Sequence, residues 1–222
     1  MVYFEKSQPA PICLANEKLK SSGAYNCGDV LATLKIDFKN KCYICENKDL
    51  VSINIEHFIP HKGDVNLKFD WNNLFYACAH CNNIKLAKYD KIINCCDSAA
   101  NVEGRLKYTF DPFPHESVFV EALDGDEETI QTAQLLNEVY EGTTTMKILE
   151  SSNLRNKVLD EVLEFQTLIR DYIKADDNEL LKDQLLPKIV GHVKKSSNFT
   201  AIKRAKITKN QFLNNLFSQY FD

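Results

Sequence analysis

Four of the eight cysteines lie in two pairs whose spacing is typical of metal ligands. Cys42 and Cys45 form one C-x-x-C pair, and Cys78 and Cys81 form a second. A two-residue spacer lets one tight turn present both sulfur atoms to the same ion, and four thiolates make a closed tetrahedral zinc site. The alternative, a redox-active pair or four unrelated buried thiols, explains one such pair more readily than two. The spacing therefore predicts one structural zinc ion.

Between the two cysteine pairs lie residues that are suited to hydrolytic chemistry. Breaking a phosphodiester requires a base that deprotonates water and a cation that neutralises the charge developing on the phosphoryl oxygens. His57, with an ordinary pKa of about 6.5, is a suitable base at neutral pH. Glu56 and Asn82 offer oxygen atoms of the kind that Mg²⁺ or Mn²⁺ prefers. Because neighbouring residues of a strand point to opposite faces, Glu56 and His57 can share one site only where the strand twists or ends.

The pattern around these residues indicates the elements that must position them. Residues 51–55 alternate between apolar and polar side chains, which predicts a half-buried strand that runs into Glu56. Residues 58–70 contain turn-forming proline, glycine, asparagine and aspartate, which predicts a loop. The second cysteine pair opens a predicted helix that continues through Ala87. One zinc ion would thus hold a strand, a loop and a helix together.

The remainder of the chain is predicted to be mainly helical. Residues 11–40 place apolar side chains on one helical face, and residues 154–173 carry a broader apolar stripe at the same spacing. Further helices are predicted at 180–193, bent or divided by Pro187, and at 211–220. We therefore expect an α+β fold that is mainly α, with N-terminal helices and an all-α C-terminal region.

An acidic stretch interrupts the sequence near its middle. From Tyr108 to Met146 there is no lysine or arginine, and prolines and a glycine break the pattern. We therefore place a domain boundary inside this stretch and expect two regions, 1–110 and 111–222. The second region is the expected contact for a partner or for DNA.

The one basic segment lies near the end of the chain. No acidic residue occurs between Asp183 and Asp222, whereas seven basic residues do. A DNA contact and a solvated face explain this segment equally well. Its basic residues are Lys188, Lys194, Lys195, Lys203, Arg204, Lys206 and Lys209.

Composition limits the class of protein. The 222 residues carry a net charge of −4, which excludes the uniformly basic type of nucleic-acid-binding domain. Residues 1–14 lack the features of a signal peptide, and no apolar run approaches the length needed to cross a bilayer, so we expect a cytosolic protein. Because disulfides are rare in a reducing compartment, we expect the other four cysteines to pack as free thiols. These are Cys13, Cys27, Cys95 and Cys96.

The segment from Cys42 to Lys88 resembles the HNH nuclease motif of the ββα-metal, treble-clef kind. In that family an acidic residue and a histidine at the end of the first strand supply a metal ligand and the general base, and Glu56 and His57 match them. A central asparagine followed by leucine fixes the catalytic loop through hydrogen bonds to the backbone. Asn73 matches that position, with Asn72 as the adjacent alternative.

The resemblance implies roles for two further residues, and the position of His61 leaves its role open. The residue directly after the last cysteine is a metal ligand in the family, and Asn82 matches it, which makes this sequence an H-N-N variant. An amide oxygen is a weaker ligand than imidazole for soft ions, which favours magnesium, or manganese, as the catalytic cation. Lys85 matches a lysine that is expected to contact phosphate. His61 is either a second metal ligand or substrate contact, or a histidine of the surface loop.

Segments outside the motif resemble HNH nucleases of bacterial anti-phage defence. Residues 3–6, with Pro9 and Pro11, and residues 197–204 are similar to segments of PtuB-like nucleases of Septu and retron systems. This resemblance implies an ATPase partner that is encoded nearby.

The sequence therefore predicts a metal-dependent HNH endonuclease that hydrolyses phosphodiester bonds in DNA. Two rival hypotheses stay open. The first is a non-catalytic, zinc-stabilised adaptor whose C-terminal helices dock a partner. The second is an enzyme that cleaves RNA with the same site. The acidic net charge favours partner-assisted capture of nucleic acid, because the isolated chain should bind it weakly and with a steep dependence on salt.

Overall fold

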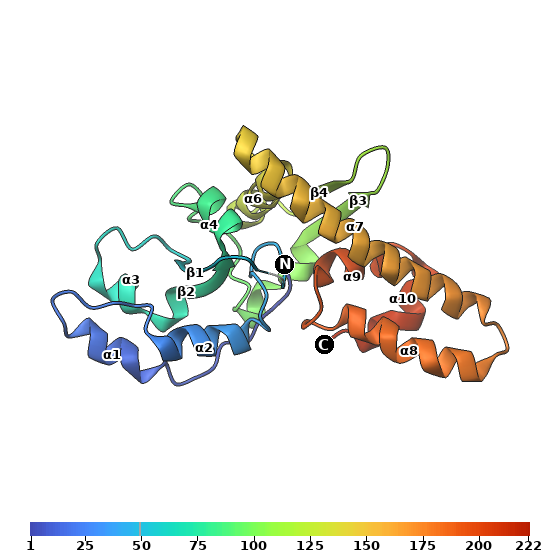
Figure 1. Cartoon of the computed structure of the whole chain (residues 1–222), viewed down its shortest axis with the longest axis horizontal. Helices are drawn as coiled ribbons and strands as arrows, with labels where there is room; N and C mark the ends of the chain where they lie inside the picture. The colour runs from blue at the N-terminus through green and yellow to red at the C-terminus, as the bar shows by residue number, and fades with distance from the viewer. Residues whose placement is uncertain (49) are drawn as a thin grey trace.

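The computed structural model describes residues 1–48 and 50–222. Figure 1 shows the N-terminal helices on one side of the molecule and the C-terminal helices on the other, with β1, β2 and α4 toward the middle. The first half contains α1 (Ile12–Lys18), α2 (Gly28–Asp37), β1 (Ile53–His57), α3 (Val65–Phe69), β2 (Leu74–Cys78), α4 (Ala79–Lys85) and α5 (Val102–Arg105). The second half contains β3 (Leu106–Asp111), β4 (Ser117–Ala122), α6 (Glu127–Glu141), α7 (Thr145–Lys174), α8 (Glu179–Val193), α9 (Thr200–Thr208) and α10 (Gln211–Phe217). The expected α+β, mainly helical fold class is confirmed.

β1 and β2 form an antiparallel pair in which His57 lies opposite Leu74. β2 is buried along its whole length, whereas in β1 only Glu56 is fully buried. The chain then turns at Cys78, whose sulfur accepts the backbone N–H of Cys81 and so caps the start of α4. β1, β2 and α4 therefore form the expected ββα unit.

β3 and β4 form a second antiparallel pair, within the stretch where the sequence suggested a domain boundary. β3 buries alternate side chains between Leu106 and Phe110, as a strand with one covered face does. Asn137 of α6 holds β4, because its side chain both accepts from and donates to the backbone of Val120 at 2.9 Å. The expected boundary at 110/111 falls inside this hairpin, and the larger hydrophobic core includes residues on both sides of it. One core thus spans this position, and the division into regions 1–110 and 111–222 stays a prediction.

α7 to α10 form the expected all-helical end of the chain. α7 runs for 30 residues from Thr145, and the side chain of the preceding Thr144 accepts the backbone N–H of Lys147. α8 is continuous although it contains Pro187, so the proline does not divide the helix. α9 was not expected, because its buried face includes basic as well as apolar side chains and so lacks a purely apolar stripe.

Two hydrophobic cores hold the chain together. The larger joins the N-terminal segment, the ββα unit, the β3–β4 hairpin, α6 and the first part of α7. The smaller joins the second part of α7 to α8, α9 and α10. α7 contributes to both cores and therefore connects the two ends of the molecule (Figure 1). Within the part of the chain that the structure describes, no helix is both long and apolar enough to cross a membrane.

Lys203 and Arg204, near the centre of the basic segment, are buried and form ion pairs. Lys203 Nζ lies 2.8 Å from Glu161, and the guanidinium of Arg204 lies 2.9 Å from Glu103 and 2.6 Å from Asp222. Both basic side chains are almost completely buried. A DNA contact is therefore excluded for these two residues, because α9 turns both side chains inward, where partly exposed acidic side chains pair with them.

Cys13 and Cys27 form a disulfide between the first turn of α1 and the residue before α2. The expectation that they pack as free thiols is therefore wrong, because the two short helices bring both sulfur atoms together. Cys95 is a buried free thiol and Cys96 a partly buried one, in agreement with the expectation for that pair.

Candidate functional site

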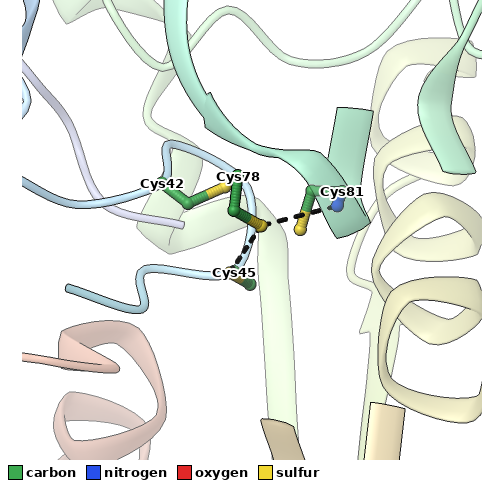
Figure 2. Close-up of side chains that lie close together, drawn as sticks. All are labelled: Cys42, Cys45, Cys78 and Cys81. Atoms are coloured by element: carbon green, nitrogen blue, oxygen red, sulfur yellow. Dashed lines mark hydrogen bonds between the residues drawn. The ribbon is translucent and has the colours of Figure 1, made fainter. Parts of the chain in front are cut away.

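The four paired cysteines converge on one point. Their sulfur atoms all lie within 4.8 Å of one another, and all four residues are buried. Cys45 Sγ lies 3.9 Å from Cys78 Sγ, and a tetrahedral zinc ion with bonds of about 2.3 Å sets its sulfur ligands about 3.8 Å apart. Figure 2 shows Cys42 and Cys45 on one loop and Cys81 beside the end of β2, near Cys78. The cluster therefore fits the expected structural zinc.

The surroundings of Cys78 favour its thiolate form. Hydrogen bonds from the other three cysteines, Cys42 first, hold the pKa of the Cys78 thiol well below its ordinary range. Zinc binds the thiolate, and its own charge deprotonates neighbouring thiols. The hydrogen bond with Cys42 raises the pKa of the Cys45 thiol, and burial raises that of Cys81, so these two thiols would need the charge of a bound zinc ion to lose their protons.

His80 lies inside the second cysteine pair but does not belong to the metal cluster. Its Nδ1 lies 2.6 Å from Glu150 Oε2, and its Nε2 lies 2.8 Å from the carbonyl oxygen of Val139. Both ring nitrogens are therefore engaged on α6 and α7. His80 connects these helices to α4 and leaves the zinc to the four thiols.

A cavity of about 330 Å³ lies between the end of β1, the loop that follows it and α4. We refer to it as the His57 cavity. β1 ends at His57, and both Glu56 and His57 reach this space although neighbouring strand residues point to opposite faces. The residues that line it with polar groups are Glu56, His57, His61, Lys62 and Asn82. The histidine from β1 and the asparagine from α4 thus face one space.

A backbone carbonyl fixes the orientation of His57. His57 Nε2 lies 3.0 Å from the carbonyl oxygen of Lys68. Because a carbonyl oxygen only accepts hydrogen bonds, Nε2 carries the proton and Nδ1 is left as the basic nitrogen. Tyr25 packs edge-on against the ring, with the two ring centroids 4.5 Å apart. Burial lowers the pKa of His57 from its ordinary value of 6.5, so the ring is neutral at neutral pH.

Asn73 ties the loop after β1 to the residues before β2. Its Nδ2 donates to Ile59 O at 2.9 Å and to Leu67 O at 3.0 Å, and its Oδ1 accepts the Ile59 N–H at 2.7 Å. Its own carbonyl oxygen accepts the Phe58 N–H at 2.9 Å. The buried amide therefore holds both ends of the loop that follows His57.

Replacing Asn73 with alanine is expected to lower the free energy of unfolding by about 2–4 kcal/mol, because three partly buried backbone groups lose their partner. Equilibrium unfolding in urea measures this change. Asn72 is exposed, so Asn72→Ala is a matched control, with an expected effect within about 0.5 kcal/mol. Equal destabilisation by the two substitutions would contradict the role of Asn73 in holding the loop.

Glu56 and Lys85 form a buried ion pair. Lys85 Nζ lies 2.7 Å from Glu56 Oε1 and donates to the carbonyl oxygen of Phe58 at 2.9 Å. The side chain of Lys85 is 0% exposed, so its ammonium group is held inside the ββα unit. α4 turns this lysine toward β1 and away from solvent, and the expected contact of Lys85 with phosphate stays a prediction.

The second carboxylate oxygen of Glu56 is in a different situation. Among the described residues, neither Glu56 Oε2 nor the buried Tyr43 hydroxyl has a hydrogen-bond partner. Burial raises the pKa of Glu56 to about 7, in spite of the attraction of Lys85. The Tyr43 hydroxyl nevertheless interacts with this carboxylate and, like Lys85, acts to lower its pKa.

Asn82 and His61 complete the polar lining. Asn82 directly follows Cys81 in α4, so the zinc cluster fixes its place beside the His57 cavity. His61 Nδ1 accepts the Gly63 N–H at 3.1 Å, and its ring centroid lies 4.6 Å from that of His57. Carboxylate and amide oxygens are ligands of magnesium and manganese, so Glu56 and Asn82 fit a site for either ion.

Three residues that shape the site carry no signal in the sequence: Tyr25, Tyr43 and Lys68. Tyr25 contacts the ring of His57 from the loop between α1 and α2. The side chain of Lys68 donates to the carbonyl oxygen of Gly23 in the same loop at 2.8 Å. No spacing rule connects residue 25 with residue 57, because only the tertiary packing of α1 and α3 brings them together.

Residues 42–88 match a protein-family model described as HNH endonuclease. Comparison with curated proteins gave no match, and comparison with solved structures gave none. The matched segment contains both cysteine pairs and all the residues that line the His57 cavity. Residues 42–88 of this chain are therefore similar to the HNH endonuclease family.

Proposed function

We propose that this protein is a metal-dependent endonuclease that hydrolyses phosphodiester bonds in DNA. The family match supports a nuclease of the HNH family. The observation that carries the finer proposal is that His57 and Asn82, which match the base and a metal ligand of that family, line one cavity.

In this proposal His57 is the general base. Its Nδ1 takes a proton from water, the water oxygen forms a bond to phosphorus, and the bond from phosphorus to the leaving sugar oxygen breaks. The resulting imidazolium carries a proton on each nitrogen, and the Lys68 carbonyl oxygen, 3.0 Å from Nε2, still accepts a hydrogen bond. This carbonyl therefore stabilises the positive charge that base catalysis creates on the ring.

Asn73 acts on the same step from a distance. Its bond to Leu67 O, at 3.0 Å, fixes the residue next to the Lys68 carbonyl. Its bonds to Ile59 fix the other end of the loop, close to His57. Asn73 is therefore a positioning residue, which keeps His57 and the Lys68 carbonyl oxygen in place relative to each other.

Glu56 and Asn82 would hold the catalytic ion, magnesium or manganese, through a carboxylate oxygen and an amide oxygen. Such an ion, when bound, neutralises the charge that develops on the phosphoryl and leaving oxygens. Lys85 fixes Oε1 of Glu56 and so orients the carboxylate. The cysteine cluster has a separate task, which is to hold the ββα unit together around zinc.

The wider setting that we propose is bacterial anti-phage defence in the cytoplasm, together with an ATPase partner. The similarity of residues 3–6 and 197–204 to PtuB-like nucleases supports this setting. The net charge of −4 agrees with a nuclease that receives help in capturing its substrate.

Cleavage assays with the purified chain test the proposal. Supercoiled plasmid DNA and a structured RNA are each offered with Mg²⁺, with Mn²⁺, or without an added divalent ion. We expect the DNA to be cut with either ion and to stay intact without one. Cleavage of RNA alone would support the rival ribonuclease, and intact DNA and RNA under all conditions would favour the zinc-stabilised adaptor.

A further inference from the structure

A groove of about 640 Å³ lies between the second half of α7 and the helices α9 and α10. Four basic residues line it: Arg170 and Lys174 from α7, Lys206 from α9 and Lys209 at the end of α9. We refer to it as the basic groove. Figure 1 shows α7 running across the molecule beside α9 and α10, in the orange and red part of the chain.

The charge of the basic groove differs from that of the chain as a whole. The chain has 31 acidic and 27 basic residues, yet no acidic residue is among those described as lining the groove. Two amides, Gln166 and Asn210, add neutral hydrogen-bonding groups, and apolar side chains complete the lining. Positive charge is therefore concentrated here in a protein that is acidic overall.

Three of the four cations are open to solvent. Lys174 and Lys209 are exposed, and the side chain of Arg170 is 59% exposed. Arg170 lies 2.8 Å from Asp171, but an exposed pair of this kind contributes little and exchanges readily. These three charges are thus available to an incoming anion.

Lys206, the fourth cation of the basic groove, is half-buried. Its Nζ donates to the carbonyl oxygen of Phe110 at 3.3 Å. Burial lowers the pKa of Lys206, nearby Asp111 opposes this, and the like charge of Lys209 lowers it further. Asp111 is therefore an acidic group close to Lys206. Lys206 and Lys209 repel each other, and a bound anion would relieve this repulsion.

The position of these lysines within the basic segment separates them from their neighbours. Lys203 and Arg204 are turned into the protein and paired with acids. Lys206 and Lys209 lie beyond them along the chain and line the basic groove. The same helix thus uses one set of cations for stability and leaves a second set for a ligand.

We propose that the basic groove binds the phosphate backbone of the nucleic acid that the HNH domain cuts, an inference that rests on the proposed function. Arg170 and Lys174 are one helical turn apart, about 6 Å along α7, and the lysines of α9 lie on the other side of the groove. Two rows of cations suit a linear polyanion, because each contact neutralises a phosphate and releases a condensed counterion. Amide groups such as those of Gln166 and Asn210 commonly bond to phosphate and sugar oxygens.

The basic groove lies on the opposite side of the molecule from the His57 cavity. In Figure 1, α9 and α10 lie at one end, while α3 and the β1–β2 pair lie toward the other. Contacts in the groove therefore hold the substrate without touching the reacting atoms. Weakening them should raise KM for cleavage and leave kcat unchanged, because binding in the ground state and in the transition state is weakened equally.

The test compares two triple variants of the full chain. The groove variant replaces the three exposed cations and leaves Lys206 in place: Arg170→Gln, Lys174→Gln and Lys209→Gln. The control variant removes the same charge from exposed lysines elsewhere: Lys20→Gln, Lys91→Gln and Lys107→Gln. Thermal unfolding of both variants establishes that each one folds.

Binding to a short fluorescein-labelled DNA duplex is measured over a range of salt concentrations, without added magnesium or manganese. Each lost phosphate contact reduces the slope of log affinity against log salt by about 1, so the slope of the groove variant should be smaller by about 3. We expect its affinity to fall about 10-fold to 100-fold at low salt, and the control variant to keep the slope of the wild type.

Equal slopes for the groove variant and the wild type would overturn the proposal. A groove variant that loses affinity for polyglutamate but keeps its affinity for DNA would assign the groove to an acidic protein partner and would overturn it as well. Plasmid cleavage separates this failure from that of the proposed function. If the wild type cuts while the slopes are equal, only the groove proposal is refuted; if the wild type does not cut, the nuclease proposal itself is refuted.

Discussion

A protein in which Cys78 is replaced by serine is expected to lose its zinc and to unfold in the ββα unit. Zinc contributes about 10–16 kcal/mol in small zinc-binding peptides, and a whole domain is usually stable by only about 5–15 kcal/mol. The loss of one of four thiolates should therefore remove most of the stability of this unit. Zinc content per chain and the thermal unfolding temperature measure the two effects.

The dimensions of the unit explain why so much depends on the metal. Each strand of the β1–β2 pair has five residues and α4 has seven. A two-stranded pair of this length is marginal by itself in water. Cys78 also ends β2 and caps α4, so its replacement disturbs the junction between the strand and the helix directly.

Cys96→Ser is the matched control for this experiment. Cys96 is a free, partly buried thiol outside the four-cysteine cluster. The control protein should keep its zinc and unfold within a few degrees of the wild type. A Cys78→Ser protein that retains both its zinc and its unfolding temperature would contradict the structural role of the cluster.

The elements around the motif were predictable because short-range patterns specify them. The alternation at 51–55 indicates a strand, and β1 covers Ile53–His57. The two C-x-x-C pairs indicate a common ion, and their sulfur atoms do converge. In both cases the information lies in residue spacing, which the backbone geometry of a strand or a tight turn converts directly into position.

The β3–β4 hairpin was not predicted from the sequence. Leu106, Tyr108 and Phe110 alternate with more exposed residues, which is the signal of a strand. The acidic composition and the two prolines of the following stretch instead suggested a boundary between domains. The hairpin forms because α6 covers its apolar face, and that long-range packing outweighs the local turn signals.

The functional site was likewise predictable from the sequence only in part. The convergence of His57 and Asn82 follows from the motif, since one residue ends β1 and the other begins the helix after the last cysteine. The environment of Lys85 does not follow from the motif, because a lysine at this position could extend to solvent or turn toward β1. Only the burial of Glu56 on the inner side of β1 decides that its carboxylate meets Lys85.

Replacing His57 with alanine is expected to slow DNA cleavage by about 10²-fold to 10⁴-fold while leaving the fold intact. The substitution removes the base but leaves the β1–β2 pairing and the hydrogen bonds of Asn73 in place. The lost contact between His57 Nε2 and Lys68 O is worth about 1 kcal/mol. Cleavage of plasmid DNA under single-turnover conditions, together with a thermal unfolding curve, separates the chemical effect from the structural one.

The dependence of the wild-type rate on pH reports the same residue. Only the neutral ring can accept a proton, so the rate should rise with pH and level off once His57 is deprotonated. Because burial lowers the pKa of His57 below 6.5, this plateau should begin at a lower pH than for an exposed histidine. The residual activity of His57→Ala should lack the rise, since no ring titrates in that protein.

His115→Ala is the control, because His115 is exposed and lies outside the His57 cavity. It should cut DNA at the rate of the wild type and show the same pH profile. Equal cleavage by wild type and His57→Ala would refute the assignment of the base. The comparison with Cys78→Ser then separates two kinds of inactive protein, since one keeps its zinc and its fold but lacks a proton acceptor, whereas the other loses the unit that brings His57 and Asn82 together.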